Sequence, residues 1–328
     1  MPQIIQLKNT QGLELTLMTK GAALLSLKVP VGEEKREVLA ACKPEDYDRQ
    51  GAYLNAIAGR FANRIANSTM SFVGETYHVT PSQGPHCLHG GLIGFDKKEW
   101  SVKELAEDRV VLTLISPDGD QGFPGECQVE LTYSLMNTEL TIEIKAHVNK
   151  PSPVNLTSHA YFNLDNHRSD VRHHSLSIQA TQYLPIDNLG IPLADAPANL
   201  PIAMDLREQT LLDQQWLNHP QLVSAKGFDH CYILDTADET EIAATLISAD
   251  QQLKMDVYTN QPGLQLYTGN YLAGNPAAEG EPYHDYEALC LEAQLLPDSP
   301  NRLEFGDPWL LPDQEYKHIT RYQFTSLT

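Results

Sequence analysis

The sequence predicts an all-β fold, a large antiparallel β-sandwich with few short helices. Three observations lead to this prediction. Apolar and polar residues alternate with a period of two in many segments, as in strands that bury one face. Clusters of Gly, Pro, Asn and Asp separate these segments, and 21 prolines in 328 residues disfavour long helices. Candidate helical segments are few and short.

The alternation is clearest in the middle of the chain. Residues 127–135, CQVELTYSL, and residues 140–148, LTIEIKAHV, each place apolar side chains at every second position. The intervening MNTE predicts a hairpin turn, which would pair the two strands as antiparallel neighbours. Similar patterns predict further strands at 13–19, 110–115, 174–180, 242–248 and 252–258.

The best helical candidate is residues 206–218. In residues 206–218, Leu206, Leu211, Leu212 and Trp216 would form an apolar stripe. We expect this stripe to pack on a sheet, because core-facing stripes are far commoner than cofactor sites. The sequence shows neither internal repeats nor a long linker. We therefore expect residues 1–328 to form a single domain.

Composition narrows the class of partner. Hydrophobic residues make up 41% of the chain, which disfavours disorder, and a formal net charge of −20 repels nucleic-acid phosphates and anionic lipids. The start, MPQIIQLKNTQG, has no basic stretch followed by an apolar run, and no apolar segment approaches membrane-spanning length. We expect a cytoplasmic monomer or homodimer that acts on a small ligand, without nucleic-acid or membrane partners.

The cysteines predict free thiols. They stand at positions 42, 87, 127, 231 and 290, an odd number with wide spacing and no C-x-x-C pair. Such a set is typical of a reducing compartment, and it suggests neither a disulfide framework nor a thiolate metal site.

Two polar clusters lie before the middle of the chain. GRFANRIAN, residues 59–67, carries Arg60, Asn63 and Arg64, which are either surface charge beside a turn or a guanidinium and amide suited to sugar hydroxyls or a carboxylate. CLHGGLIGFDKKEW, residues 87–100, places His89 before two glycines that allow close backbone approach to a ligand. A lone His before Gly-Gly is more often a turn residue than a catalyst.

Four further polar residues interrupt strand-like segments. They are His159 in NLTSHAYFN, Asp229 in KGFDHCYIL, Gln265 in PGLQLYTGNYL and Glu292 in LCLEAQLLPDSPN. Taken singly, each is more often a polar residue at a strand end than a catalyst. Glu292 is the most unusual, because an apolar run is a costly place for a carboxylate unless the protein uses it.

A metal site is one alternative. His89, His159 and Glu292 have the residue types of a His₂-carboxylate set, but they are far apart in sequence and show no H-x-H or H-x-x-x-H pairing. P-loop, Rossmann and G-x-S-x-G motifs do not occur in the sequence. We therefore expect neither a metal nor a cofactor.

Seven motifs in a fixed order resemble one family. They are GRFANRIANSTMSFVGETYHV, LHGGLIGFDKKEW, DGDQGFPGE, NLTSHAYFNLD, KGFDHCYIL, PGLQLYTGNYL and LEAQLLPDSPN. Together, from about residue 13 to the C-terminus, they resemble the aldose 1-epimerases, also called galactose mutarotases, of the bacterial cytosolic type. The resemblance implies a large twisted β-sandwich, the galactose mutarotase-like supersandwich, with a shallow sugar cleft across one sheet.

The resemblance also implies an activity and a set of site residues. The activity is that of an isomerase, which interconverts the α and β anomers of free aldohexoses such as galactose and glucose for hexose metabolism. Glu292 would be the general base and His159 the general acid. Five residues would bind the sugar: Asn63, Arg64, His89, Asp229 and Gln265. Neither a metal nor a cofactor is implied.

Small departures from the family pattern leave the preferred sugar open. Ser158 precedes His159 where the family often has Asn, Ala293 follows Glu292, and Cys231 follows Phe-Asp-His. Two other functions also fit these residues. One is a glycoside hydrolase that uses Glu292 and Asp229 as its carboxylate pair. The other is a non-catalytic sugar-binding protein.

Overall fold

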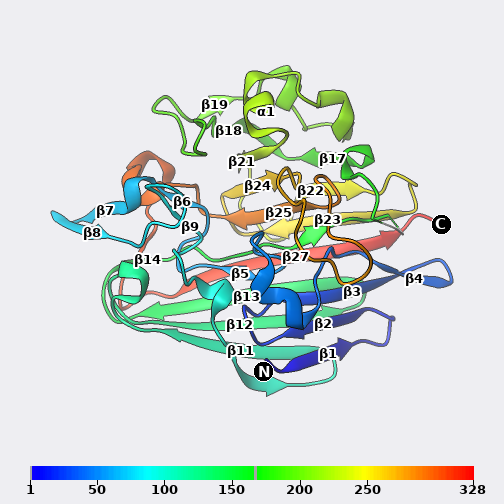
Figure 1. Ribbon diagram of the computed structural model, residues 1–328, viewed down its shortest axis with the longest axis horizontal. Helices are drawn as coiled ribbons and strands as arrows, with labels where there is room; N and C mark the ends of the chain where they lie inside the picture. Colours follow the sequence, from blue (N-terminus) through cyan, green and yellow to red (C-terminus); the bar gives the residue numbers. More distant parts are fainter. Residues whose placement is uncertain (1, 166–167) are drawn as a thin grey trace.

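Two antiparallel sheets form the main layers of the fold (Figure 1). The computed structural model describes residues 2–165 and 168–328. One sheet has nine strands, in the spatial order β10 (Ser101–Leu105), β11 (Arg109–Ser116), β12 (Cys127–Met136), β13 (Glu139–Val148), β27 (Tyr316–Ser326), β23 (Leu253–Thr259), β22 (Ile242–Ile247), β17 (Ser175–Ile178) and β20 (Thr210–Leu211). The other has six, in the order β16 (Tyr161–Phe162), β25 (Leu289–Gln294), β24 (Gly263–Tyr267), β21 (Asp229–Leu234), β18 (Ala180–Tyr183) and β19 (Ala198–Asn199).

Smaller sheets, an α-helix and short 3₁₀ segments complete the described part of the fold. The first four strands form a sheet of their own: β1 (Ile4–Lys8), β2 (Glu14–Met18), β3 (Leu24–Val31) and β4 (Glu34–Glu37). Four two-stranded ladders join β5 (Ile57–Ala58) to β15 (Thr157–Ser158), β6 (Arg64–Ile65) to β9 (Cys87–Leu88), β7 (Thr69–Phe72) to β8 (Glu75–His78), and β14 (Ser152–Pro153) to β26 (Trp309–Leu310). The α-helix of the described residues, α1 (Pro220–Ala225), lies near β18 and β19 (Figure 1).

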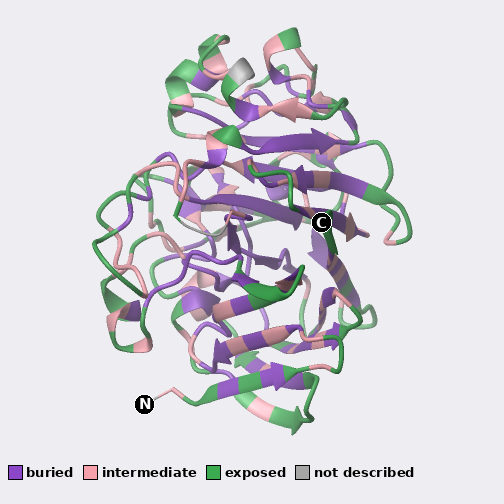
Figure 2. Ribbon diagram, turned by 90° about the vertical axis from the view of Figure 1, so that its right-hand side faces the viewer, coloured by how far each residue is buried: buried purple, intermediate pink, exposed green. Residues whose placement is uncertain are grey.

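The predicted all-β sandwich is confirmed, and its core lies between the two main sheets. The alternate apolar residues of β12 and β13 are buried, and they share one hydrophobic cluster with Leu264 and Leu266 of β24 and Leu291 of β25. Buried residues follow the strands of both sheets, and many exposed residues lie in the connections (Figure 2). The predicted hairpin is also present, with Met136 paired to Glu139 across a turn in which Asn137 takes a positive φ of 53°.

The predicted strand at 174–180 is interrupted in the structure. Residues Ser175–Ile178 form β17 in the nine-stranded sheet, whereas Ala180–Tyr183 form β18 in the six-stranded sheet. The chain therefore changes sheets at Gln179. The other strands predicted from alternation correspond to β2, β11, β12, β13, β22 and β23.

The predicted helix over 206–218 is wrong. Thr210 and Leu211 instead form the edge strand β20, which pairs with β17, and Leu212–Gln215 form a 3₁₀ turn. The backbone N–H of Leu212 donates to the carbonyl of His174. Pairing with a sheet edge thus outweighs a helical preference that is small for each residue. The helix begins later, at Pro220, where proline suits the first turn and His219 Nδ1 accepts from the N–H of Gln221.

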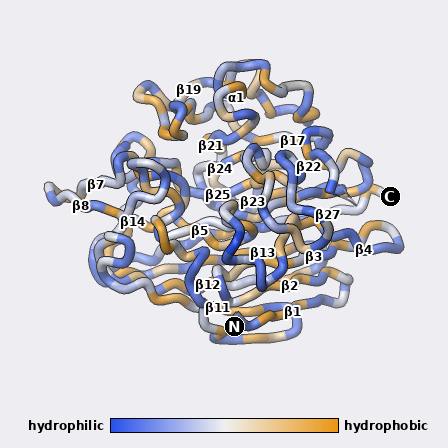
Figure 3. The backbone as a smooth tube through the Cα atoms, viewed as in Figure 1, coloured by the Kyte–Doolittle hydropathy of each residue, from blue (hydrophilic) through white to orange (hydrophobic). Residues whose placement is uncertain are grey.

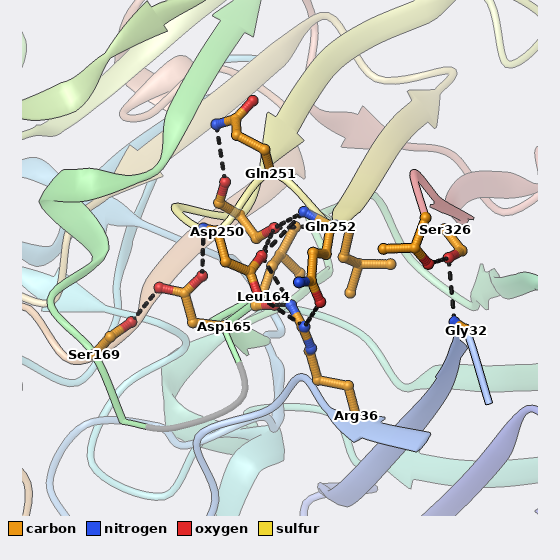
Figure 4. Close-up of polar contacts among 12 residues, drawn as sticks. Gly32, Arg36, Leu164, Asp165, Ser169, Asp250, Gln251, Gln252 and Ser326 are labelled. Carbon is orange, nitrogen blue, oxygen red and sulfur yellow. Dashed lines mark hydrogen bonds and ion pairs between the residues drawn. The ribbon is translucent and has the colours of Figure 1, made fainter. Parts of the chain in front are cut away.

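A buried guanidinium ties the N-terminal sheet to the nine-stranded sheet. Arg36 of β4 donates to both carboxylate oxygens of Asp250, at 3.2 and 2.8 Å, and to Gln252 Oε1 at 3.1 Å, both in the turn between β22 and β23 (Figure 4). It also donates to the carbonyl of Leu164 at 2.7 Å. This fork geometry suits arginine rather than lysine, because it uses several directed donors at once.

Apolar residues are spread through the chain in short stretches. Hydrophobic and hydrophilic residues alternate along the backbone tube (Figure 3). Among the residues that the structure describes, no helix is long and apolar enough to cross a membrane.

Candidate active site

Strand alternation places the candidate residues on the face of the six-stranded sheet that points away from the main core. On β25, Leu289 and Leu291 join the main core, so Glu292 points to the opposite face. On β24, Leu264 and Leu266 point inward in the same way, and Gln265 points outward as the register partner of Glu292.

Loops from the first third of the chain close over this face and leave a cleft of about 180 Å³. All seven residues that the resemblance implied for the site line it: Asn63, Arg64, His89, His159, Asp229, Gln265 and Glu292. The structure therefore brings together polar groups that are up to 229 positions apart in the chain, between Asn63 and Glu292.

The backbone and ring of His159 are both held in place. Its N–H donates to the carbonyl of Ala56 at 2.9 Å, and its carbonyl accepts from the N–H of Asn55 at 3.2 Å. Its imidazole stacks on Tyr161, with ring centroids 5.0 Å apart, and on Tyr53, at 5.9 Å. These contacts aim Nε2 at Glu292, whose Oε1 lies 3.7 Å away.

Burial disfavours charge on both members of this pair. Glu292 is 2% exposed and His159 is 5% exposed. Burial raises the pKa of Glu292 well above its usual value, the nearby Asp229 carboxylate raises it further, and Arg64 opposes them. Burial also lowers the pKa of His159 to about 4, against a smaller opposing effect of its own backbone carbonyl. When the pair holds one proton between them, burial thus favours protonated Glu292 beside neutral His159.

His89 is oriented by the neighbouring Asn63. The backbone N–H of Asn63 donates to His89 Nδ1 at 3.2 Å, and the backbone N–H of His89 donates to the carbonyl of Asn63 at 3.0 Å. Because Nδ1 accepts a hydrogen bond, the proton of the neutral ring is on Nε2. His89 also meets His159 edge to face, with ring centroids 5.2 Å apart. His89 therefore offers an N–H donor beside the reactive pair.

The other polar groups are held at fixed angles around the cleft. Gln265 Nε2 donates to Asp229 Oδ1 at 2.7 Å, which fixes the direction of the amide. Arg64 Nε donates to Gln83 Oε1 at 2.7 Å. Within the described part of the chain, Gln265 Oε1 and Glu292 Oε2 are buried without a hydrogen-bond partner. Buried acceptors of this kind suit the hydroxyl groups of a ligand.

Five lining residues with polar side chains were not nominated from the sequence: Tyr53, Gln83, Tyr161, Tyr267 and Tyr271. Tyr161 and Tyr267 stand two positions after His159 and Gln265, so the period of two could have identified them. Tyr53, Gln83 and Tyr271 come from loops, where periodicity carries no such signal.

Arg60, by contrast, is not part of the cleft lining. It is 1% exposed and donates to the carbonyls of Ser116, Pro117, Pro124 and Gly125. Its guanidinium therefore anchors residues 116–125 to the segment that carries Arg60. Arg64, four positions later, lies at the cleft.

The three residues of the metal alternative do meet. One potential ligand atom from each of His89, His159 and Glu292 lies within 4.8 Å of the other two. However, a metal ligand must offer a lone pair, and the hydrogen bond from Asn63 places the proton of His89 on Nε2. The donor set therefore suits a hydroxyl or ring oxygen better than a cation.

Metal removal tests this interpretation. We expect exhaustive treatment with EDTA or phenanthroline to leave activity unchanged, because the arrangement supplies its own proton donor and acceptor. The measurement is the rate of the catalysed reaction before and after chelation, with metal content determined on both samples. A loss of activity that one divalent ion restores would instead support the His₂-carboxylate site.

Comparison with known proteins gives matches over nearly the whole chain. The family model described as aldose 1-epimerase matches residues 3–323. The aldose 1-epimerase of Escherichia coli K12 is 43% identical over 98% of this chain and 95% of its own length. The human galactose mutarotase is 36% identical over 95% of this chain and 91% of its own length. Among solved structures, an aldose epimerase homologue from C. elegans superposes with a TM-score of 0.92 at 28% identity, with 100% of both chains covered.

Proposed function

The chain belongs to the aldose 1-epimerase family of isomerase-type enzymes, and we propose that it interconverts the α and β anomers of free aldohexoses, galactose and glucose among them, in hexose metabolism. The observation that carries the proposal is the buried pair of Glu292 and His159, with 3.7 Å between Oε1 and Nε2, on a cleft lined by polar side chains. A carboxylate and an imidazole at this distance can exchange protons with the C1 hydroxyl and the ring oxygen of one hemiacetal.

Ring opening requires two proton transfers. Opening starts from the ionic form of the pair, in which the shared proton has moved from Glu292 to His159. The Glu292 carboxylate then takes the proton of the C1 hydroxyl, and His159 gives its Nε2 proton to the ring oxygen. The bond between C1 and the ring oxygen breaks as the C1 carbonyl forms. The pair is then neutral, which is the distribution that burial favours. Each transfer by a positioned side chain is typically worth about 10²–10⁴-fold in rate.

Ring closure reverses the same steps on the other face. After rotation about the C1–C2 bond, the hydroxyl of the open chain returns its proton to His159 Nε2 and attacks C1. Glu292 returns its proton to the carbonyl oxygen, which becomes the new C1 hydroxyl. The protons balance over the cycle, so the reaction needs no nucleophile, redox group or co-substrate.

The remaining groups hold a neutral polyol. We assign Asn63, Arg64, Asp229 and Gln265 to the sugar hydroxyls, and we assign the Nε2–H of His89 to the ring oxygen or a neighbouring hydroxyl. Arg64 supplies directed donors, and the buried Gln265 Oε1 supplies an acceptor whose direction Asp229 fixes. Directed contacts of this kind keep the open aldehyde bound while C1 rotates.

Methyl β-D-galactopyranoside separates this function from its two rivals. Its anomeric oxygen carries a methyl group, so Glu292 has no proton to remove and the ring cannot open. We expect the glycoside to inhibit mutarotation of galactose competitively and to release no galactose, whereas free galactose mutarotates faster with the protein. The measurements are polarimetry on fresh α-D-galactose and α-D-glucose and a coupled assay for released galactose.

The rivals predict different results in the same two assays. A hydrolase would release galactose from this glycoside, or from an activated aryl galactoside, in a manner that depends on both Glu292 and Asp229. A sugar-binding protein would bind both ligands and accelerate neither reaction. Unchanged mutarotation of both free sugars would therefore refute the proposed function.

A further inference from the structure

The imidazole of His159 has a second contact, at the nitrogen that faces away from Glu292. Cys290 Sγ lies 3.4 Å from His159 Nδ1. Both residues are buried, with 0% of Cys290 and 5% of His159 exposed. The imidazole therefore lies between two groups of one strand, because Cys290 and Glu292 are two positions apart on β25 and point to the same face.

The chemistry of the proposed function asks for a particular proton at Nδ1. When protonated His159 gives up its Nε2 proton, the neutral ring keeps the proton on Nδ1, and Nε2 is left with the lone pair that later takes the proton back. The opposite tautomer would leave Nε2 already protonated, so it could not accept the proton of the open-chain hydroxyl. A group that accepts from Nδ1–H therefore keeps the ring in the useful form.

We propose that Cys290 is a positioning residue, whose sulfur accepts a hydrogen bond from His159 Nδ1–H and so makes Nε2 the nitrogen that exchanges protons with the sugar. This proposal rests on the proposed function for its catalytic consequence. The contact of 3.4 Å itself does not depend on the reaction, whereas the direction of its hydrogen bond is inferred from the tautomer that the reaction needs.

A neutral thiol suits this position better than a carboxylate. Burial raises the pKa of Cys290 well above its usual value, and the nearby Glu292 and Asp229 carboxylates raise it further, so the thiol stays uncharged. A carboxylate at residue 290 would add a further acidic group to this buried cluster. It would also hold His159 in its charged form and make it a weaker acid.

The neighbouring contacts restrain the sulfur and the ring in one arrangement. Cys290 is the register partner of Tyr161, whose side chain stacks on His159 with ring centroids 5.0 Å apart. The hydroxyl of Tyr161 donates to the carbonyl of Ala52 at 2.9 Å, which anchors that ring in turn. The stacked tyrosine fixes the plane of the imidazole, and the sulfur selects which nitrogen carries the proton.

The test is ¹⁵N NMR of the histidine side chains in the sugar-free protein, together with kinetics. A protonated and an unprotonated ring nitrogen differ strongly in ¹⁵N shift, and the signals of His159 are identified by their loss in His159→Asn. In the wild-type protein at neutral pH we expect Nδ1 protonated and Nε2 unprotonated. An unprotonated Nδ1 would overturn the proposal whether or not the protein accelerates mutarotation.

Variants separate this role from simple packing. In Cys290→Ala we expect the His159 signals to shift toward a mixture of tautomers and kcat to fall about tenfold, as for the loss of one hydrogen bond in the transition state, with KM little changed. Cys290→Ser, which keeps an acceptor, should restore the tautomer and part of kcat. Cys127→Ala removes another buried thiol, in β12 of the nine-stranded sheet, and should change neither measurement.

Two results with these variants would contradict the proposal. One is wild-type kcat and wild-type ¹⁵N shifts in Cys290→Ala. The other is an equal loss of kcat in Cys290→Ala and Cys290→Ser with the tautomer unchanged, which would mean that the sulfur only fills space.

Discussion

Replacing Glu292 with glutamine is expected to lower kcat by at least about 10²-fold while the sugar still binds. Glutamine keeps the shape of the side chain but cannot accept the C1 hydroxyl proton. Mutarotation also proceeds without the protein, so kcat is taken from the protein-dependent part of the polarimetric rate on fresh α-D-galactose. Binding of the sugar is measured by calorimetry.

The control for this variant is Glu304→Gln. Glu304 is exposed and pairs with Arg302, and it is not among the residues that line the cleft. The Glu304→Gln variant should retain the kcat and KM of the wild type. A near-normal kcat in Glu292→Gln would refute the assignment of the base. A loss of binding without a loss of kcat would assign Glu292 to the sugar hydroxyls instead.

Replacing His159 with asparagine is expected to cause a similarly large fall in kcat, because asparagine cannot deliver a proton to the ring oxygen. The double variant Glu292→Gln with His159→Asn should be much less impaired than the product of the two single losses. The two side chains act on one hemiacetal, so the second removal costs little once the first has disabled the route.

The control for His159→Asn is a substitution of another buried histidine, His318. His318 is 1% exposed, and its ring contacts the Leu156 carbonyl and Thr320 Oγ1 away from the cleft. His318→Asn should lower thermal stability but leave the kcat of the folded protein close to that of the wild type. Fully multiplicative losses in the Glu292–His159 pair would show that one of the two has only a structural role.

The strands were the most predictable part of the fold, for a physical reason. β12 and β13 are long, bury one face and are joined by a tight turn, so their period of two is unbroken in the sequence. The helix over 206–218 was mispredicted because its leucines satisfy a helical period by chance. In the structure, Thr210 and Leu211 instead pair with β17 at the edge of the nine-stranded sheet. Periodicity in a short segment does not indicate whether its backbone will form hydrogen bonds within a helix or with a neighbouring strand.

The site shows a similar division. The polar residues on strands, such as Gln265 and Glu292, were conspicuous because each interrupts an apolar run. Their roles came from the resemblance to a family, since no spacing in the sequence indicates that His159 and Glu292 lie 3.7 Å apart. Tyr53, which stacks on His159, comes from a loop and gave no signal. The roles of the site residues, the single domain, the cytoplasmic location and the monomeric or homodimeric state remain predictions.

If Glu292 and His159 open the sugar ring, the bond between C1 and its own hydroxyl oxygen stays intact. The most direct test uses galactose labelled with ¹⁸O at C1, in ordinary water, with ¹³C NMR to follow both anomer exchange and the label. We expect the protein to accelerate exchange between the α and β signals while the label stays at C1 through many exchanges, and we expect Glu292→Gln to abolish the acceleration. Loss of ¹⁸O to solvent at the rate of anomer exchange would contradict this expectation, because ring opening and closure at this site keep the C1 oxygen.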